Sequence, residues 1–442
     1  MGAALDATRF VDEQRLAGRN AWRRTPPAAA GDTREPAVNR SLYYGSAGVV
    51  LLLLELAEAT GDSARLDEAV AAGEDIVAYL DGVDRQSVSV SRGWPGYGFV
   101  LTELAAASGR DEFTAAAARC YERLRAQATP LGAGIGWIEP APFAEITGFS
   151  GEREIYDQSV GAAGAALALL HAHRHGVHPD ALRWAAEAGD RLLEVGEPDP
   201  AGTRWVLMAD MPFPFTAPNF AHGGAGVGYF LLQLQQSTGD ARYLDAALSA
   251  ARYVESRGTW MGDGAARGML VCHTEEARQP IFYLGACHGP PGTGRLFLEL
   301  HRVTGDDHWL ELAHALWRGA ECLGAPEQRS VGLWNNHSQC CGDAALGEYA
   351  LLMAQRTGDG GYLDAARRCA DVMIASSVVG RGDGGTTRHW VQAEHRDRPT
   401  FVEAQIGYMQ GAAGIASFLI HLSTTLAGAP VKIALPDWPT RN

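Results

Sequence analysis

GSAGVVLLLLELAEATGDSARLDEAVAAGEDIVAYL, residues 45–80, is one complete copy of the unit from which the chain is built. It begins with a G-x-x-G motif and continues as an apolar run that ends at Thr60-Gly61-Asp62. Glycine is a common left-handed C-cap of a helix and aspartate a good N-cap, so this tripeptide predicts that one helix ends and another begins. The first helix is apolar nearly all round, which predicts burial, whereas the second carries a charged stripe that faces water.

The G-x-x-G motif recurs along the whole chain, and each copy is followed by an apolar helical run. The copies begin near residues 45, 93, 161, 223, 289, 342 and 411. In the sixth copy, Gly342-Asp-Ala-Ala345, alanine takes the last position. Successive copies lie 48 to 69 residues apart, which leaves room for two helices and two loops in each unit. Units of this kind bury their apolar faces by stacking on their neighbours.

Seven stacked helix pairs can form an open solenoid or a closed ring. An open solenoid needs terminal units with a polar outer face, and neither end copy is polar. We therefore expect an all-α fold, an α/α toroid with seven inner and seven outer helices, in a single domain over residues 1–442. Residues 1–40 would form an N-terminal extension or the first outer helix. Strand signals are weak, and residues 206–220 are the main irregular stretch.

Charge and composition narrow the functional class. The net charge is −15 and no run is rich in lysine or arginine, which argues against nucleic acid and anionic membranes as partners. The longest apolar stretch, Val49 to Leu54, is far shorter than the roughly 20 residues that span a bilayer. The N-terminus has no apolar signal-peptide core. Seven scattered cysteines do not indicate a disulfide framework, so we expect a reducing, cytoplasmic location.

Three cysteines lie directly before G-x-x-G motifs, in two consecutive units: Cys287, Cys340 and Cys341. Closure of the ring would bring equivalent positions of neighbouring units together at one mouth of the barrel. Adjacent cysteines in a turn before a helix can bind one metal, and a helix N-terminus favours thiolate. Three thiolates with an open fourth position are typical of a catalytic rather than a structural zinc site. The sequence therefore predicts bound Zn²⁺.

Histidine and aspartate occupy similar places in other units. His222 and His288 each precede the first glycine of a motif, and Asp157 lies four residues before Gly161. His337, in an Asn-Asn-His turn, is equally compatible with the pocket and with a structural role. Taken singly, a cysteine at a helix start is more often a small buried residue, and His222 would be structural about as often as functional. The prediction of a site depends on the shared position across repeats.

The remaining cysteines and histidines receive structural interpretations. Cys120, Cys322 and Cys369 fall inside helical stretches and are interpreted as ordinary helix residues. Cys272-His273 is not followed by a G-x-x-G motif, and its purpose stays open.

These motifs resemble the lanthionine synthetase C-like family over nearly the whole chain. The segment Ala286-Cys287-His288-Gly289 is similar to the family's W-C-x-G segment, and Cys340-Cys341-Gly342 to its C-H-G segment. His222 and Asp157 match a further histidine and aspartate of the family. The resemblance implies a sevenfold α/α toroid with a zinc ion at its centre, held by Cys287, Cys340 and Cys341.

The chain also departs from the family pattern. Cys341 stands where the usual ligand is histidine, although a subgroup of the family has cysteine there. Ala286 replaces a tryptophan, and Tyr283 replaces a basic residue that the family often carries. His288 resembles a histidine found in some members. We therefore expect the pocket wall to differ from that of most family members. The group that transfers the proton is expected to differ as well.

The resemblance implies a lanthipeptide cyclase that adds peptide cysteine thiolates to dehydroalanine or dehydrobutyrine and so forms lanthionine or methyllanthionine rings. His222 would protonate or stabilise the enolate, and Asp157 would orient His222 or accept the thiol proton. The expected substrate is a dehydrated precursor peptide with a leader segment. Because the seven units leave no room for a kinase or lyase domain, separate dehydratase proteins are expected as partners.

Three other functions fit the sequence. The first is addition of a small thiol such as glutathione to dehydroamino acids, and the second is a toroid that binds peptides without chemistry. The third is a helical-toroid glycosidase, which needs two facing carboxylates, for which Asp157 and Asp343 are the candidates. About one zinc per chain, lost in a Cys287→Ala variant, would favour a zinc-dependent thiol-adding enzyme over a glycosidase or a binding toroid.

Overall fold

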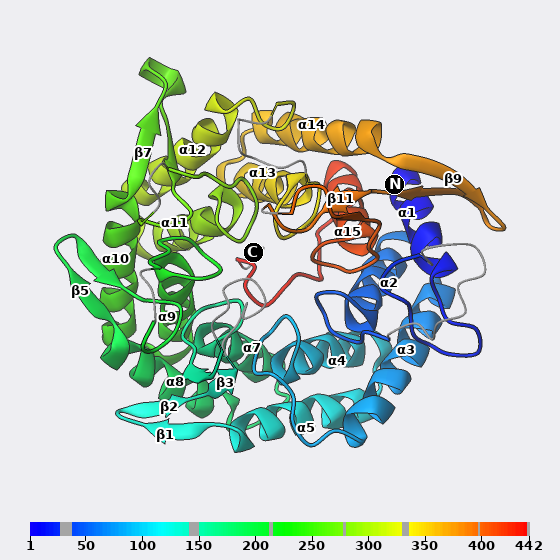
Figure 1. Cartoon of the computed structure of the whole chain (residues 1–442), viewed down its shortest axis with the longest axis horizontal. Coiled ribbons are helices and arrows are strands. Elements are labelled where there is room, and N and C mark those ends of the chain that lie inside the picture. The colour runs from blue at the N-terminus through cyan, green and yellow to red at the C-terminus, as the bar shows by residue number, and fades with distance from the viewer. Residues whose placement is uncertain are drawn as a thin grey trace.

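The helices form two concentric rings (Figure 1). The structure, a computed structural model, describes residues 1–26, 38–140, 150–211, 215–276, 280–328, 336–396 and 398–439. Among these residues the inner ring consists of α2 (Ser46–Thr60), α4 (Trp94–Ser108), α7 (Ala162–Arg174), α9 (Gly224–Thr238), α11 (Pro290–Thr304), α13 (Asp343–Thr357) and α15 (Ala412–Leu426). The outer ring consists of α1 (Gly2–Glu13), α3 (Ser63–Asp81), α5 (Asp111–Ala126), α8 (Ala181–Val195), α10 (Ala241–Ser256), α12 (Asp307–Cys322) and α14 (Gly361–Ser376).

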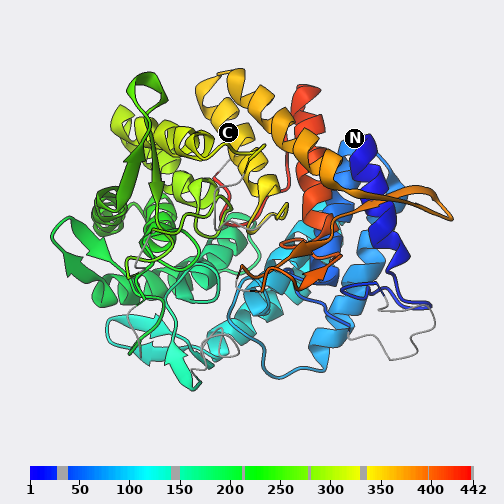
Figure 2. The same ribbon diagram turned by 45° about the horizontal axis from the view of Figure 1, so that its top comes forward.

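The inner ring is closed. Each inner helix contacts the next one along the chain, and α15 contacts α2. Each outer helix packs against the inner helix that precedes it, except that α1, at the N-terminus, packs against α15. Figure 2 shows α1 beside α15 from a second direction. The predicted toroid of seven inner and seven outer helices is thus confirmed, and residues from both ends of the chain complete the seventh helix pair.

The helix boundaries follow the sequence signals. Gly61 ends α2 in the left-handed conformation with φ of 71°, and Asp62 then caps α3 by accepting a hydrogen bond from Ala64 N–H. The motif glycines are required by close packing at the starts of the inner helices. A Cβ at Gly223 would lie 1.5 Å from the carbonyl oxygen of Ala217, so only glycine lets the preceding loop cross the helix start so closely.

The strands are a finding that the sequence did not predict. Six two-stranded antiparallel sheets occur in the described residues. The pairs are β1 (Thr129–Leu131) with β2 (Gly134–Gly136), β3 (Ile138–Pro140) with β4 (Glu152–Glu154), β5 (Glu197–Asp199) with β6 (Gly202–Arg204), β7 (Gly258–Met261) with β8 (Gly268–Val271), β9 (Val378–Gly382) with β10 (Gly385–His389), and β11 (Gln392–Ala393) with β12 (Val402–Glu403). A short 3₁₀-helix, η1 (Gly264–Ala266), lies between β7 and β8.

All six strand pairs lie between an outer helix and the next inner helix. Buried tryptophans that follow three of them donate Nε1–H to carbonyl oxygens near the end of the preceding outer helix. Trp137 donates to Leu124 at 2.9 Å, and Trp205 donates to Leu192 at 2.8 Å. Trp390 makes the same kind of bond. Carbonyls at a helix end lack intrahelical partners, so each hairpin folds back to satisfy one of them.

No α-helix in the described part of the chain is long and apolar enough to cross a membrane.

Candidate metal centre

The seven loops that lead into the inner helices join in a ring of hydrogen bonds at one mouth of the barrel. Equivalent residues stand two positions before the first glycine of each motif: Tyr43, Ser91, Ser159, Ala221, Cys287, Cys340 and Met409. In six of the seven steps around the ring, the backbone N–H of the residue at this position donates to the carbonyl oxygen of the equivalent residue in the next loop, at 2.9–3.2 Å. The donor and acceptor positions are 159 and 221, 221 and 287, 287 and 340, 340 and 409, 409 and 43, and 43 and 91. At the remaining step the Ser89 hydroxyl donates to the Ser159 carbonyl at 2.9 Å. Neighbouring loops therefore run in matched register, which places equivalent residues side by side.

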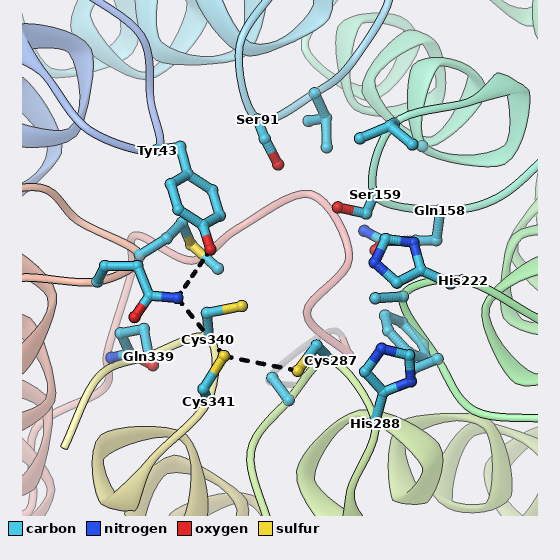
Figure 3. Close-up of a pocket in the computed structure, with 18 of the residues that line it drawn as sticks. Tyr43, Ser91, Gln158, Ser159, His222, Cys287, His288, Gln339, Cys340 and Cys341 are labelled. Atoms are coloured by element: carbon cyan, nitrogen blue, oxygen red, sulfur yellow. Dashed lines mark hydrogen bonds between the residues drawn. The ribbon is translucent and has the colours of Figure 1, made fainter. Parts of the chain in front are cut away.

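The three cysteines converge as a result of this register. Cys287 N–H donates to the Cys340 carbonyl at 3.1 Å, so the two loops touch at the position of the thiols. The Sγ atoms of Cys287 and Cys341 lie 3.7 Å apart, and all three sulfurs lie within 4.8 Å of one another (Figure 3). Tetrahedral zinc with Zn–S bonds of about 2.3 Å places its sulfurs about 3.8 Å apart. The spacing of the three sulfurs is therefore compatible with one zinc ion held between them.

Hydrogen bonds within the cluster favour one thiolate among the three sulfurs. Bonds from Cys287 and Cys341 hold the pKa of the Cys340 thiol well below its usual range, whereas hydrogen bonds to neighbouring cysteines raise the pKa of the Cys287 and Cys341 thiols. Gln410 Nε2 lies 3.5 Å from the Cys341 sulfur and donates to the Tyr43 hydroxyl at 2.8 Å. Burial and then the charge of Cys340 raise the pKa of Tyr43, which keeps its proton. Metal binding requires thiolates, so a cluster that already favours one of them binds a cation more readily.

His222 and Asp157 form a hydrogen-bonded pair on the side of the cavity opposite Cys340 and Cys341 (Figure 3). The Nδ1 atom of His222 lies 2.5 Å from Oδ2 of Asp157, and the other carboxylate oxygen accepts the Val160 N–H at 2.8 Å. Asp157 is only 1% exposed and does not line the cavity, whereas His222 does. A carboxylate on Nδ1 fixes the orientation of the ring and directs Nε2 to other partners. Asp157 is therefore placed to orient His222.

Further aromatic side chains line the cavity wall opposite Cys340 and Cys341 (Figure 3). His288 lies between His222 and His273, with ring centroids 5.2 and 4.3 Å away, and Tyr283 packs against His273 at 4.8 Å. Burial, followed by the neighbouring histidines, lowers the pKa of His288 well below its usual value. Burial also lowers the pKa of His273 to about 4, helped by His222 and Arg396. Both imidazoles are therefore neutral near pH 7. Figure 3 shows His222 and His288 on the side of the cavity opposite Cys340 and Cys341.

Two possibilities that the sequence left open do not agree with the structure. His337 does not line the cavity. Its Nδ1 contacts Asp343 at 2.7 Å and its Nε2 the Ser376 hydroxyl at 2.9 Å, so both ring nitrogens are used in a buried structural network. Asp157 and Asp343 do not form a pair of facing carboxylates either, because each is buried against its own histidine and neither lines the cavity.

The cavity behind the mouth has a volume of about 1200 Å³. Residues from all parts of the ring line it, including the three cysteines, His222, His288 and Tyr283. The segment that follows α15 returns into the hole of the toroid (Figure 1). There Asp437 contacts Arg295 of α11 at 2.8 Å and accepts a hydrogen bond from Gln158 at 2.9 Å. The cavity is large enough for a peptide segment and carries both acidic and basic side chains.

Four residues that belong to the site were not identified from the sequence. Tyr43 and Gln410 contact the sulfurs, and they occupy the positions in units one and seven that correspond to Cys340 and Cys341 in unit six. Alignment of the seven motifs would have identified both. His273 and Arg396 reach the cavity from loops next to β8 and β11, outside the repeat register. The Cys272-His273 pair thus contributes its histidine to the cavity wall.

Several solved structures share this fold. "Nisin cyclase" matches with a TM-score of 0.64 and 14% identity, covering 95% of this chain and 94% of that one. A cellobiose 2-epimerase from Bacillus thermoamylovorans matches with a TM-score of 0.52 and 11% identity, over 95% and 98% of the two chains. A GH76 α-mannanase from Bacteroides thetaiotaomicron matches with a TM-score of 0.51 and 13% identity, over 97% and 96%. At these identities the likenesses establish the fold alone.

Sequence comparison is more specific. No curated protein matches the chain. The model of the family described as "Lanthionine synthetase C-like protein" matches residues 36–427, which include all seven motifs and the three cysteines. The chain therefore belongs to the lanthionine synthetase C-like protein family.

Proposed function

We propose that the protein is a zinc-dependent lanthipeptide cyclase that joins peptide cysteines to dehydroalanine or dehydrobutyrine through thioether bonds. The observation that carries this proposal is the convergence of three thiols across the cavity from the His222–Asp157 pair, at the mouth of a cavity of about 1200 Å³. Cys287, Cys340 and Cys341 would hold the zinc, which would supply a lowered pKa for a substrate thiol. Family membership and the cyclase-like fold agree with it.

The reaction is an addition in which no atom is lost. The substrate thiol releases its proton to solvent, from which the proton donor is later restored. The thiol sulfur bonds to the β-carbon of the dehydroamino acid, and the alkene electron pair moves to form an enolate. The α-carbon then takes a proton. His222 is the proposed donor, because its ring lies across from the sulfurs and Asp157 orients it. General acid catalysis of this kind contributes about 10²–10⁴ in rate.

The rest of the cavity wall would position the peptide. His288, His273 and Tyr283 offer neutral, mainly apolar ring faces, against which the carbon skeleton near the alkene can pack. We expect the substrate to be a precursor peptide, with a leader segment, that separate dehydratase proteins have already dehydrated. A cytoplasmic location would keep the three thiols reduced.

A test needs a peptide that contains one cysteine and one dehydroalanine. Ring closure leaves the peptide mass unchanged but removes the thiol, so alkylation followed by mass spectrometry distinguishes product from substrate. The zinc-loaded protein should convert the peptide to a form that no longer alkylates. Cys287→Ala should lose the zinc equivalent that the thiols bind and with it the activity.

Other outcomes would identify the alternatives. A mass increase equal to glutathione, when glutathione is present and ring closure is absent, would identify an enzyme that adds small thiols. Tight binding of the peptide with its thiol still alkylatable, in protein shown to contain zinc, would identify a peptide-binding toroid. Either result would contradict the cyclase proposal.

A further inference from the structure

A second group of metal-binding side chains lies at the opposite end of the inner ring. His171 and His175 belong to the last turn and C-cap of α7, and Glu103 lies on the neighbouring inner helix α4. Helix α7 begins at the mouth that carries the cysteines. Its 13 residues, at about 1.5 Å each, place its C-terminal end about 19 Å away. This group is therefore separate from the cysteine cluster.

The three side chains lie close together. Residues four apart in a helix lie on the same face, and the rings of His171 and His175 stack with centroids 4.3 Å apart. Nε2 of His171 lies 2.7 Å from Oε1 of Glu103. One ligand atom from each of the three residues lies within 4.8 Å of the other two. His175 is exposed, so water and ions can reach the group from solvent.

One nitrogen of this group lacks a partner. His171 is only 6% exposed, and its Nδ1 atom is buried without a hydrogen bond in the described part of the structure. Leaving a buried polar atom unpaired is costly, and an isolated His171–Glu103 contact would not remove that cost. A carboxylate on one ring nitrogen is what metal-binding histidines usually have, because it orients the ring and raises the basicity of the other nitrogen.

We propose that His171, His175 and Glu103 form a second metal site, which binds a divalent transition-metal ion such as Zn²⁺ and links α4 to α7. Two imidazoles suit this class of ion, Glu103 holds the ring of His171 through its other nitrogen, and the exposed side leaves room for water molecules as further ligands. The site lies outside the cavity of the proposed cyclase reaction, so it binds independently of the thiols. Its effect would be to stabilise the inner ring where α4 and α7 meet.

The test is zinc stoichiometry in the full chain without a histidine tag, after removal of metal with a chelator and reloading with Zn²⁺ alone. The wild type should bind two zinc ions per chain, and His175→Ala should bind one. His173→Ala is the matched control, because this exposed histidine is in the same helix turn, about 200° around the axis from His171. It should still bind two. Cys287→Ala should lose only the ion at the thiols, which separates this site from the proposed catalytic one.

Two further measurements guard against misfolded variants. Glu103→Gln keeps the side-chain shape and should weaken zinc binding at this site at least tenfold in competition with a chelating dye. With Co²⁺, the thiolates give intense near-ultraviolet charge-transfer absorption, which His175→Ala should retain in full. The proposal is overturned if His175→Ala binds as much zinc as the wild type and His173→Ala.

Discussion

At the scale of single residues, the pairing of His222 with Asp157 carries the sharpest expectation. Asp157→Asn keeps the size of the side chain but replaces a carboxylate, which only accepts hydrogen bonds, with an amide that can also donate, so the tautomer and orientation of His222 are no longer fixed. We expect kcat for ring closure to fall about 10²-fold with zinc content unchanged. Alkylation-based kinetics together with metal analysis of the same samples check this prediction.

The chain offers a matched control for that substitution. Asp343 contacts His337 in a similar buried pair outside the cavity. Asp343→Asn should lower the melting temperature but leave kcat within about twofold, because no reacting group depends on this pair. Equal losses of activity in both variants would show that Asp157 acts through stability alone.

The third cysteine ligand sets a second expectation at this scale. Zinc with three thiolates carries a net charge of −1 before substrate binds, whereas two thiolates and a neutral imidazole leave it uncharged. More negative charge makes a substrate thiolate a better nucleophile. Cys341→His should therefore retain zinc, because histidine is also a good ligand, while ring closure slows. An unchanged rate in zinc-loaded Cys341→His would exclude this effect of charge.

The candidate residues that were predictable share one property. Cys287, Cys340, Cys341 and His222 stand one or two positions before a motif, so the repeat register alone places them at the mouth. His337 has no such relation to a motif, and it proved to belong to a buried network. His273 and Arg396 could not be placed from the sequence because hairpin loops carry them to the cavity, and the repeats do not encode the paths of those loops.

At the scale of secondary-structure elements, the inner helices were predictable and the hairpins were not. Each inner helix has a glycine start and an apolar run of about four turns, which are strong local signals. The strands span only two to five residues and are stabilised by pairing and by tryptophan contacts with outer helices. Stability of this kind comes from tertiary contacts rather than from local propensity.

A buried charge network connects three inner helices where the ring closes. Nδ1 of His421 on α15 lies 2.6 Å from Glu348 on α13, and Nε2 lies 3.5 Å from Glu55 on α2. Burial disfavours the charged imidazole, but the two carboxylates outweigh burial and raise the pKa of His421 from 6.5 to about 9. The protonated histidine thus stabilises the closure of the ring.

This network predicts a pH dependence of stability. Because the folded-state pKa is above the unfolded value, the stabilisation is complete below about pH 6.5 and is lost as the pH rises through about 9. Between pH 7 and 9.5 the melting temperature of the wild type should fall by about 2–4 °C more than that of His421→Gln. His301→Gln, which changes a partly exposed histidine of α11, is the control and should follow the wild type. Parallel curves for the wild type and His421→Gln would contradict this role.

At the scale of the whole molecule, residues after α15 help to hold the ring together. Asp437 contacts Arg295, whose side chain is only 4% exposed, and Trp438 packs on the guanidinium at 4.4 Å. Asp437→Ala would leave a buried charge without its partner, which should lower the free energy of unfolding by about 3 kcal/mol. The exposed pair of Asp364 and Arg367 supplies the control, because Asp364→Ala should cost less than about 0.5 kcal/mol. Denaturant titrations that give similar losses for both variants would refute the prediction.

The closed toroid itself was predictable because the fold is a repeat. Seven similar units with no polar terminal unit leave the ring as the arrangement that buries every apolar face. The contact of α1 with α15 was less evident, since it joins residues from opposite ends of the chain and has no sequence signal beyond the amphipathic N-terminal helix.

The central claim is that Cys287, Cys340 and Cys341 bind one zinc ion at the mouth of the ring. A crystallographic anomalous difference map, measured at the zinc absorption edge on zinc-loaded protein, tests it most directly. We predict a peak bonded to all three sulfurs at about 2.3 Å, with one coordination position open to the cavity. The claim would be contradicted if the sulfur of Cys287 lay far from those of Cys340 and Cys341 and no peak were found between them.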